Sequence, residues 1–458
     1  MPPEPTQALA DFAATLRFDA IPERTREACK DLLLDALACA LAGHQGEETA
    51  QLAALAGALG QSDESSVIGG DRLSLAGATL LNGYLITAVT MCDTYRELLT
   101  HIMPEVLPPA LAIAERDALS GRDLLVALAA GSEVAIRVGL GLDYPVFRAK
   151  GWHGPGVLGP FGAAAAVGRL RGFDADTMAR AFGLAGSQSA GTFAAWGTPT
   201  VKFHQCRGAL SGLMAALLAE QEFVATREFL TEPDGGLYNT YAEGGKPDAA
   251  LAGLGMVWEL EKLALRPWPS ASSIQGMITA MIELTEQHEI DPAQVKQVRI
   301  ALSPPVFKLH GGFATYGAKF EAMLSAHYVA TAILHDRALT LAQFEPARYD
   351  SAALRRFAAE RVLVTEDAKL SGLTARAEIE TANGAVLSSR CEFPRGAPEN
   401  PLGRARIVDK FRTYAAPRLS QAGIETVIDA VARLEEMKSV AELFDMLRAA
   451  PRPARRSA

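Results

Sequence analysis

Five ionisable side chains lie within or soon after three long stretches that contain no Asp, Glu, Lys or Arg. The stretches are Leu73–Cys92, Gly151–Gly168 and Ala181–Val201. The ionisable side chains are Asp93, His101, His153, Lys202 and His204. Single ionisable groups on Gly-rich segments at helix boundaries are a common way to hold a reactive group over a rigid scaffold. Burial at such positions shifts pKa values, as proton transfer requires. The set therefore favours proton-transfer chemistry.

Each of these residues also has a structural interpretation. Asp93 precedes Thr94 and could cap a helix. His153, among glycines, could be a hydrogen-bonded structural histidine. Lys202 could be a solvated charge. Their joint placement favours a functional interpretation without removing the structural one.

Motifs of several other chemistries are missing from the sequence. It has no GxxxxGK[ST] phosphate loop, no HExxH metal motif and no GxSxG nucleophile elbow. The glycines of 154–159 have the wrong spacing for a dinucleotide site. The five cysteines are scattered and form no CxxC pair. We therefore expect reduced thiols in a cytoplasmic protein, and no metal site.

Composition excludes further classes of protein. The 458 residues are 49% hydrophobic and 21% charged, with a net charge of −9. This is ordinary for a globular chain and argues against a nucleic-acid or anionic-membrane binder. Leu73–Cys92 is long enough to span a membrane, but Asn82 and Gly83 favour a buried helix instead. We expect no membrane partner.

Hydrophobic periodicity predicts a mainly α protein. The first half is Ala-rich and helical, and a run of strand patterns begins after it. Val298, Ile300 and Leu302 alternate as one face of a half-buried strand. Asn383-Gly384 suits a tight hairpin. We predict a large all-α domain formed by residues 1–265 and 401–458, and a smaller α+β lid domain formed by residues 266–400.

The chain resembles the MmgE/PrpD family over nearly its whole length. The motifs on which the resemblance rests are 33–43, Asn82-Gly83 leading to Asp93-Thr94 and His101, 121–125 with Glu133-Val134, 151–153, 202–204, 266–270, 319–321 through 325–328, and Lys410-Phe411. No single motif is diagnostic. Their order and spacing together are fairly specific.

The resemblance implies a helical domain and an α+β lid, usually in a homodimer, with the active site in the cleft between them. It implies no cofactor and no metal, and a small di- or tricarboxylate as substrate. The family's pocket residues match here as Asp93, His101, His153, Lys202 and Tyr328. Three positions depart from the family pattern: Arg266 replaces a lysine, and Ala271 and Gln275 replace a cysteine and a histidine.

Family members act as dehydratases, decarboxylases or epimerases, and all three reactions place a carbanion beside a carboxylate. The leading hypothesis is a cofactor-independent hydro-lyase resembling 2-methylcitrate dehydratase. His101 or His153 would serve as acid or base, Asp93 would orient a histidine and Tyr328 would donate a proton. The groups that would bind substrate are Lys202, Arg266, His204 and Gln275. An epimerase, isomerase or decarboxylase is the first alternative, and a non-catalytic carboxylate-binding protein is the second.

Overall fold

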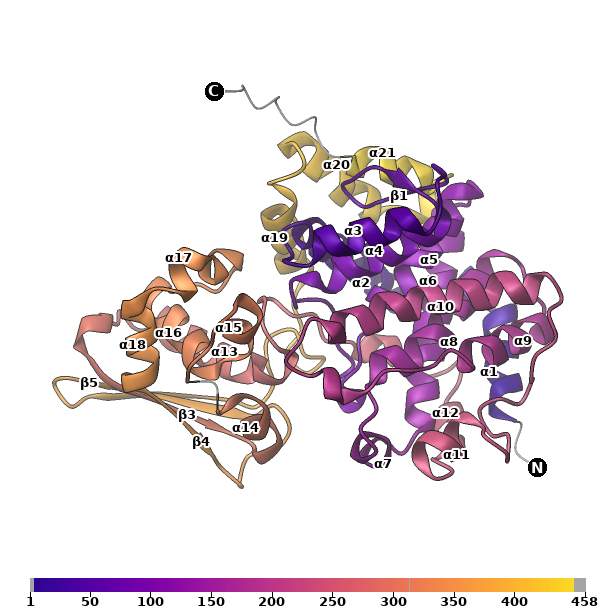
Figure 1. The fold of residues 1–458 in the computed structure, drawn as a ribbon. Coiled ribbons are helices and arrows are strands. Elements are labelled where there is room, and N and C mark those ends of the chain that lie inside the picture. Colours follow the sequence, from indigo (N-terminus) through magenta and orange to yellow (C-terminus); the bar gives the residue numbers. More distant parts are fainter. Residues whose placement is uncertain (1–3, 313, 449–458) are drawn as a thin grey trace.

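The computed structural model describes residues 4–312 and 314–448 as a large helical part beside a smaller α+β part (Figure 1). The mainly α fold with a small α+β domain is thereby confirmed. The helical part contains α1 (Pro5–Thr15), α2 (Glu23–Gly43), α3 (Thr49–Ala58), α4 (Leu75–Ala88), α5 (Met103–Arg116), α6 (Gly121–Gly141), α7 (Tyr144–Ala149), α8 (Gly154–Leu170), α9 (Ala175–Gly186), α10 (Thr200–Glu220), α11 (Leu237–Ala242), α12 (Pro247–Leu251), the hairpin β1 (Ser65–Ser66) and β2 (Arg72–Leu73), and the returning helices α19 (Arg404–Ala415), α20 (Gln421–Ala432) and α21 (Ala441–Leu447).

Small residues let the central helices approach closely. A Cβ at Gly212 of α10 would lie 2.5 Å from the carbonyl oxygen of Pro160 in α8. A Cβ at Gly162 of α8 would lie 2.7 Å from the carbonyl oxygen of Gly131 in α6. The uncharged segment around α8 is therefore the close-packed centre of the bundle. Helix α6 is long and apolar enough to cross a membrane, but 94% of its most apolar window is buried inside the protein.

The α+β part is built on one four-stranded sheet of order β4-β3-β5-β6. Strand β3 pairs in parallel with β4 and antiparallel with β5, and β5 forms a hairpin with β6. Its elements are β3 (Val295–Leu302), β4 (Val362–Glu366), β5 (Ala375–Thr381), β6 (Val386–Cys391), α13 (Gln275–Gln287), α14 (Pro304–His310), α15 (Lys319–Leu324), α16 (Ala326–Asp336), α17 (Pro346–Tyr349) and α18 (Ala352–Arg361). Val298, Ile300 and Leu302 are all buried, which confirms the predicted strand face.

Four local features differ from the sequence expectations. The sequence pattern predicts a helix over Gly208–Glu222, but α10 begins at Thr200, so Lys202 and His204 lie on its first turns rather than in a loop. The pattern also predicts one helix over Phe320–Leu334, but the structure has two, because the Ser325 hydroxyl accepts the Tyr328 N–H and starts α16 anew. Of the two turn residues Asn383 and Gly384 between β5 and β6, only Gly384 has a positive φ, 87°. Helix α19 was not expected.

Candidate active site

A small cavity lies between the helical part and the α+β part. Its volume is about 60 Å³, which is space for a handful of water molecules. The helical part contributes the side chains of His101, His153, Lys202 and Gln205. The connecting segment and the α+β part contribute Arg266, Ser272, Phe320 and Leu324. The cavity thus collects four of the side chains predicted from the sequence.

His101 is held by the backbone of Asp93. Its Nδ1 lies 2.6 Å from the Asp93 carbonyl oxygen. A carbonyl only accepts hydrogen bonds, so Nδ1 bears the hydrogen and Nε2 keeps its lone pair. Burial, and then the charge of Arg266, lower the pKa of His101 to about 3. His101 is therefore a neutral imidazole with a free basic nitrogen.

The Asp93 carboxylate itself caps helix α5. It accepts the backbone N–H groups of Ile102 at 2.8 Å and Met103 at 3.1 Å. Burial raises its pKa to about 6, against the opposing effect of those two N–H groups. The helix-cap interpretation of Asp93 thus describes its side chain, whereas its contact with His101 runs through the backbone. Asp93 thus contacts the His101 ring through its carbonyl and the next two residues through its carboxylate.

His153 and His204 form a hydrogen-bonded pair. Their Nδ1 atoms are 2.9 Å apart, so one of them donates and the other accepts. His153 stands at the start of α8, and its backbone N–H donates to the Gly191 carbonyl at 3.0 Å. Burial, and then the nearby His204 and His101, lower the pKa of His153 to about 3. If His153 donates at Nδ1, its Nε2 is a lone pair; if His153 accepts at Nδ1, its neutral form carries an N–H at Nε2.

Lys202, in the first turn of α10, places a buried cation in the wall of the cavity. Its ammonium lies 3.1 Å from a carboxylate oxygen of Glu48 and 4.7 Å from the ring centre of Phe320. Burial lowers its pKa, and Glu48 opposes this effect. One hydrogen bond to Glu48 leaves further N–H donors for a guest carboxylate.

The remaining predicted residues divide between the cavity and its surroundings. Arg266 lines the cavity, but its N–H groups already donate to the Cys92 carbonyl at 2.6 Å and the Ser270 carbonyl at 3.0 Å. Gln275 lies outside this cavity and donates to the Trp268 carbonyl at 3.2 Å. Tyr328 is fully buried, and its hydroxyl donates to the Gln343 carbonyl. The structure does not bring Gln275 and Tyr328 to the two histidines of the cavity.

Comparison with known proteins identifies the family. The MmgE/PrpD N-terminal domain model matches residues 7–250, and the MmgE/PrpD C-terminal domain model matches residues 268–436. The chain belongs to the MmgE/PrpD family. It is 28% identical to the cis-aconitate decarboxylase-like protein oryM of Aspergillus oryzae, over 96% of this chain and 97% of that relative. It is 25% identical to the cis-aconitate decarboxylases of Aspergillus terreus, over 96% and 95%, and Homo sapiens, over 97% and 94%.

Sequence reasoning missed several polar groups around the cavity of this family member. Glu48, the partner of Lys202, lies 154 positions away in the chain and has no motif of its own. Gln205 and Thr90 line the cavity, and neither the Gln205 Oε1 nor the Thr90 hydroxyl has a hydrogen-bond partner among residues 4–312 and 314–448. Gln205 directly follows the Lys202-Phe203-His204 motif, and this position was the only sign of it in the sequence. These free polar atoms are available to a guest.

The two buried histidines predict a loss of stability in acid. Both have a folded pKa of about 3, against 6.5 in an unfolded chain. Only the unfolded chain binds these protons between the two values, so their contribution is complete above pH 6.5 and is lost as the pH falls toward 3. Each pKa unit corresponds to about 1.4 kcal/mol. Asp93, with its raised pKa, acts in the opposite direction and offsets part of the loss.

Denaturant titrations between pH 7.5 and 4.5 measure this effect. We expect the free energy of unfolding of the wild-type protein to fall by several kcal/mol over that range. His101→Gln and His153→Gln should each flatten the dependence. An identical slope in the wild type and both variants would contradict the buried, neutral assignment of these rings.

Proposed function

We propose that this protein is a lyase that decarboxylates a small unsaturated tricarboxylate of the cis-aconitate type. The observation on which the proposal depends is the cavity, where two neutral imidazoles face the cations Lys202 and Arg266. The cations would bind carboxylates, and an imidazole would supply a proton. The cis-aconitate decarboxylase relatives, aligned over nearly the whole chain, support decarboxylation in particular.

The proposed reaction needs one proton donor and a place for negative charge. The bond between one carboxylate and its carbon breaks and carbon dioxide leaves. The electron pair of that bond is delocalised through the double bond onto a remaining carboxylate, which Lys202 stabilises. The charge of the bound anion raises the pKa of His153, so that an imidazolium donates its Nε2 proton to carbon and returns to the neutral form.

Dehydration of a hydroxy-tricarboxylate is the second candidate, because of the free Nε2 of His101. Elimination of water requires a base to remove a proton next to a carboxylate, whereas decarboxylation does not. His101 has such a basic nitrogen, fixed by the Asp93 carbonyl at 2.6 Å. Sequence reasoning placed this reaction first, and the relatives move it to second place.

Nuclear magnetic resonance of reaction mixtures separates the two candidates. The purified protein is incubated in deuterated buffer with cis-aconitate, citrate or 2-methylcitrate, and carbon dioxide release is followed in parallel. We expect carbon dioxide from cis-aconitate, with one solvent deuterium on carbon in the product. Elimination of water from a hydroxy acid without carbon dioxide release would favour dehydration instead. No turnover of any of these acids would overturn the proposal of a lyase.

We further propose that the protein works in the cytoplasm as a homodimer. All five cysteines are buried free thiols, as is usual in a reducing compartment. Helix α10 exposes Met214 and Leu218 by about two fifths of their surfaces, at 42% and 41%. These apolar side chains, four residues apart, supply a surface that a second copy could cover.

A further inference from the structure

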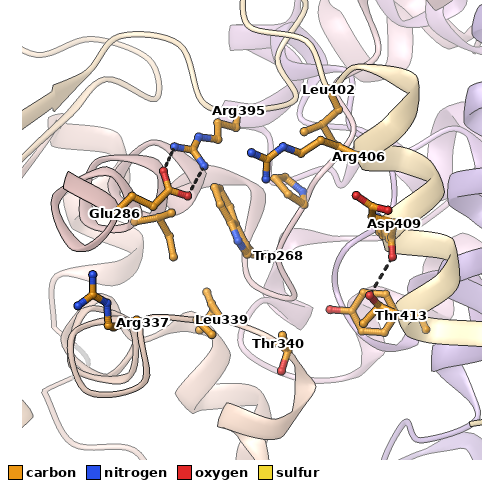
Figure 2. A pocket seen from close by; sticks show the side chains of 15 residues that line it. Trp268, Glu286, Arg337, Leu339, Thr340, Arg395, Leu402, Arg406, Asp409 and Thr413 are labelled. Atoms are coloured by element: carbon orange, nitrogen blue, oxygen red, sulfur yellow. Dashed lines mark hydrogen bonds and ion pairs between the residues drawn. The ribbon is translucent and has the colours of Figure 1, made fainter. Parts of the chain in front are cut away.

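A second and larger cavity lies at the junction of the two parts, apart from the catalytic cavity. Its volume is about 300 Å³. Helix α19 forms one wall, and the α+β part and the segment Pro267–Trp268 form the others (Figure 2). None of the histidines of the catalytic cavity lines it.

Three arginines from three different segments line this junction cavity. Arg337 follows α16, Arg395 follows β6 and Arg406 lies on the first turn of α19. Arg395 forms a double hydrogen bond with Glu286, at 3.0 and 2.6 Å. The guanidinium of Arg406 has no hydrogen-bond or ion-pair partner among the described residues, and it extends toward Arg395 above Trp268 (Figure 2).

The charges of the cavity leave an excess of cations. The two carboxylates in its lining are Glu286, which Arg395 occupies, and Asp409, which lies 3.5 Å from Arg412 outside the cavity. Arg337 donates its hydrogen bonds to backbone carbonyls, which neutralise no charge. Glu286 also interacts electrostatically with Arg406, but the lining still holds more cations than carboxylates.

The hydroxyl of a largely buried tyrosine adds a neutral donor to these cations. Tyr414 lines the cavity, its side chain is 7% exposed, and its hydroxyl has no hydrogen-bond partner in the described part of the chain. Trp268, Leu339 and Leu402 supply apolar walls. Guanidinium groups bind carboxylates through two parallel hydrogen bonds, and a carbon skeleton packs on apolar walls as an inorganic ion cannot.

We propose that the junction cavity binds a small organic di- or tricarboxylate, as a second anion site independent of the catalytic cavity. Arg406 and Tyr414 of α19 bind the guest from one side, and Arg395 binds it from the α+β part. The guest then bridges the two parts, next to the segment on which Arg266 stands. The proposal requires no particular catalytic reaction.

Calorimetric titration of the full-length protein with citrate tests the proposal. We expect Arg406→Gln to weaken one class of citrate sites about tenfold or more, and Tyr414→Phe to weaken the same class about fivefold. The Arg406 side chain is exposed and forms no hydrogen bond or ion pair with residues 4–312 and 314–448, so we expect Arg406→Gln to fold like the wild type. Arg433→Gln is the matched control, because Arg433 is an exposed arginine of the helical part that does not line the cavity.

Two further comparisons give each outcome a meaning. Lys202→Met removes the catalytic cation and should leave the Arg406-dependent site intact, whether or not the proposed lyase reaction is correct. Inorganic phosphate should bind the junction cavity more weakly than citrate. Citrate affinity unchanged by Arg406→Gln, equal losses in Arg406→Gln and Arg433→Gln, or phosphate binding as tight as that of citrate would each overturn the proposal.

Discussion

Replacing His153 by glutamine should lower kcat on cis-aconitate by about 10²- to 10⁴-fold, the usual contribution of a general acid. The amide keeps a hydrogen-bonding group toward His204 but cannot take up and release a proton near neutral pH. The substrate carboxylates would still find Lys202, whose ammonium is held by Glu48 at 3.1 Å. We therefore expect KM to change much less than kcat, as measured by steady-state kinetics.

His204→Gln is the matched comparison for this experiment. The Nδ1 atoms of His204 and His153 are 2.9 Å apart, and His204 does not line the cavity. Its loss should reduce kcat by about tenfold and move the pH profile, because the proton on His153 then has a different partner. A kcat of His153→Gln within threefold of the wild type, with folding intact by circular dichroism, would remove His153 from the proposed reaction.

The sequence predicted the cavity better than it predicted the contacts inside it. The charge-free stretches pointed to His153 within one of them, Lys202 at the end of another and His101 soon after the first, because a closely packed helical core excludes other charges. The same pattern could not show that Asp93 reaches His101 through its carbonyl, at 2.6 Å. Backbone contacts of this kind depend on the path of the chain and not on residue type.

Long-range partners were out of reach for the same reason. Glu48 pairs with Lys202 across 154 positions, and the sequence around either residue does not indicate the other. Helix α19 was missed although its buried residues Ile407, Phe411 and Tyr414 recur at helical spacing. The helix nevertheless carries Lys410, quoted only as part of a family motif, and the structure gives that lysine a physical role.

Replacing Lys410 by methionine should lower the free energy of unfolding by about 3–5 kcal/mol, the usual cost of removing one partner of a buried ion pair and leaving the other charge unpaired. The Lys410 ammonium is buried and lies 2.7 Å from Asp35. It also donates to the carbonyls of Met91 at 2.9 Å and Arg266 at 2.8 Å. Burial alone would lower the pKa of Lys410, but Asp35 outweighs this effect and raises it. One ammonium thus joins α2, α19 and two segments next to the cavity.

The loss in Lys410→Met should depend on pH in a defined direction. Without the ammonium, the buried Asp35 carboxyl has a pKa far above that of an unfolded chain, so the cost is small in acid and grows as the pH rises. Asp35→Asn combined with Lys410→Met should recover much of the stability, because no unpaired charge remains. Lys438→Met, at an exposed position of the same domain, is the control and should change little.

The same variant also tests how Arg266 is positioned. Lys410 holds the Arg266 carbonyl, and the Arg266 guanidinium in turn donates to the Cys92 carbonyl at 2.6 Å beside Asp93. Activity assayed well below the melting temperature should therefore fall in Lys410→Met and stay low in the stabilised double variant. Full activity in the double variant would mean that Lys410 supports only the stability of the fold and that the cavity positions Arg266 without it.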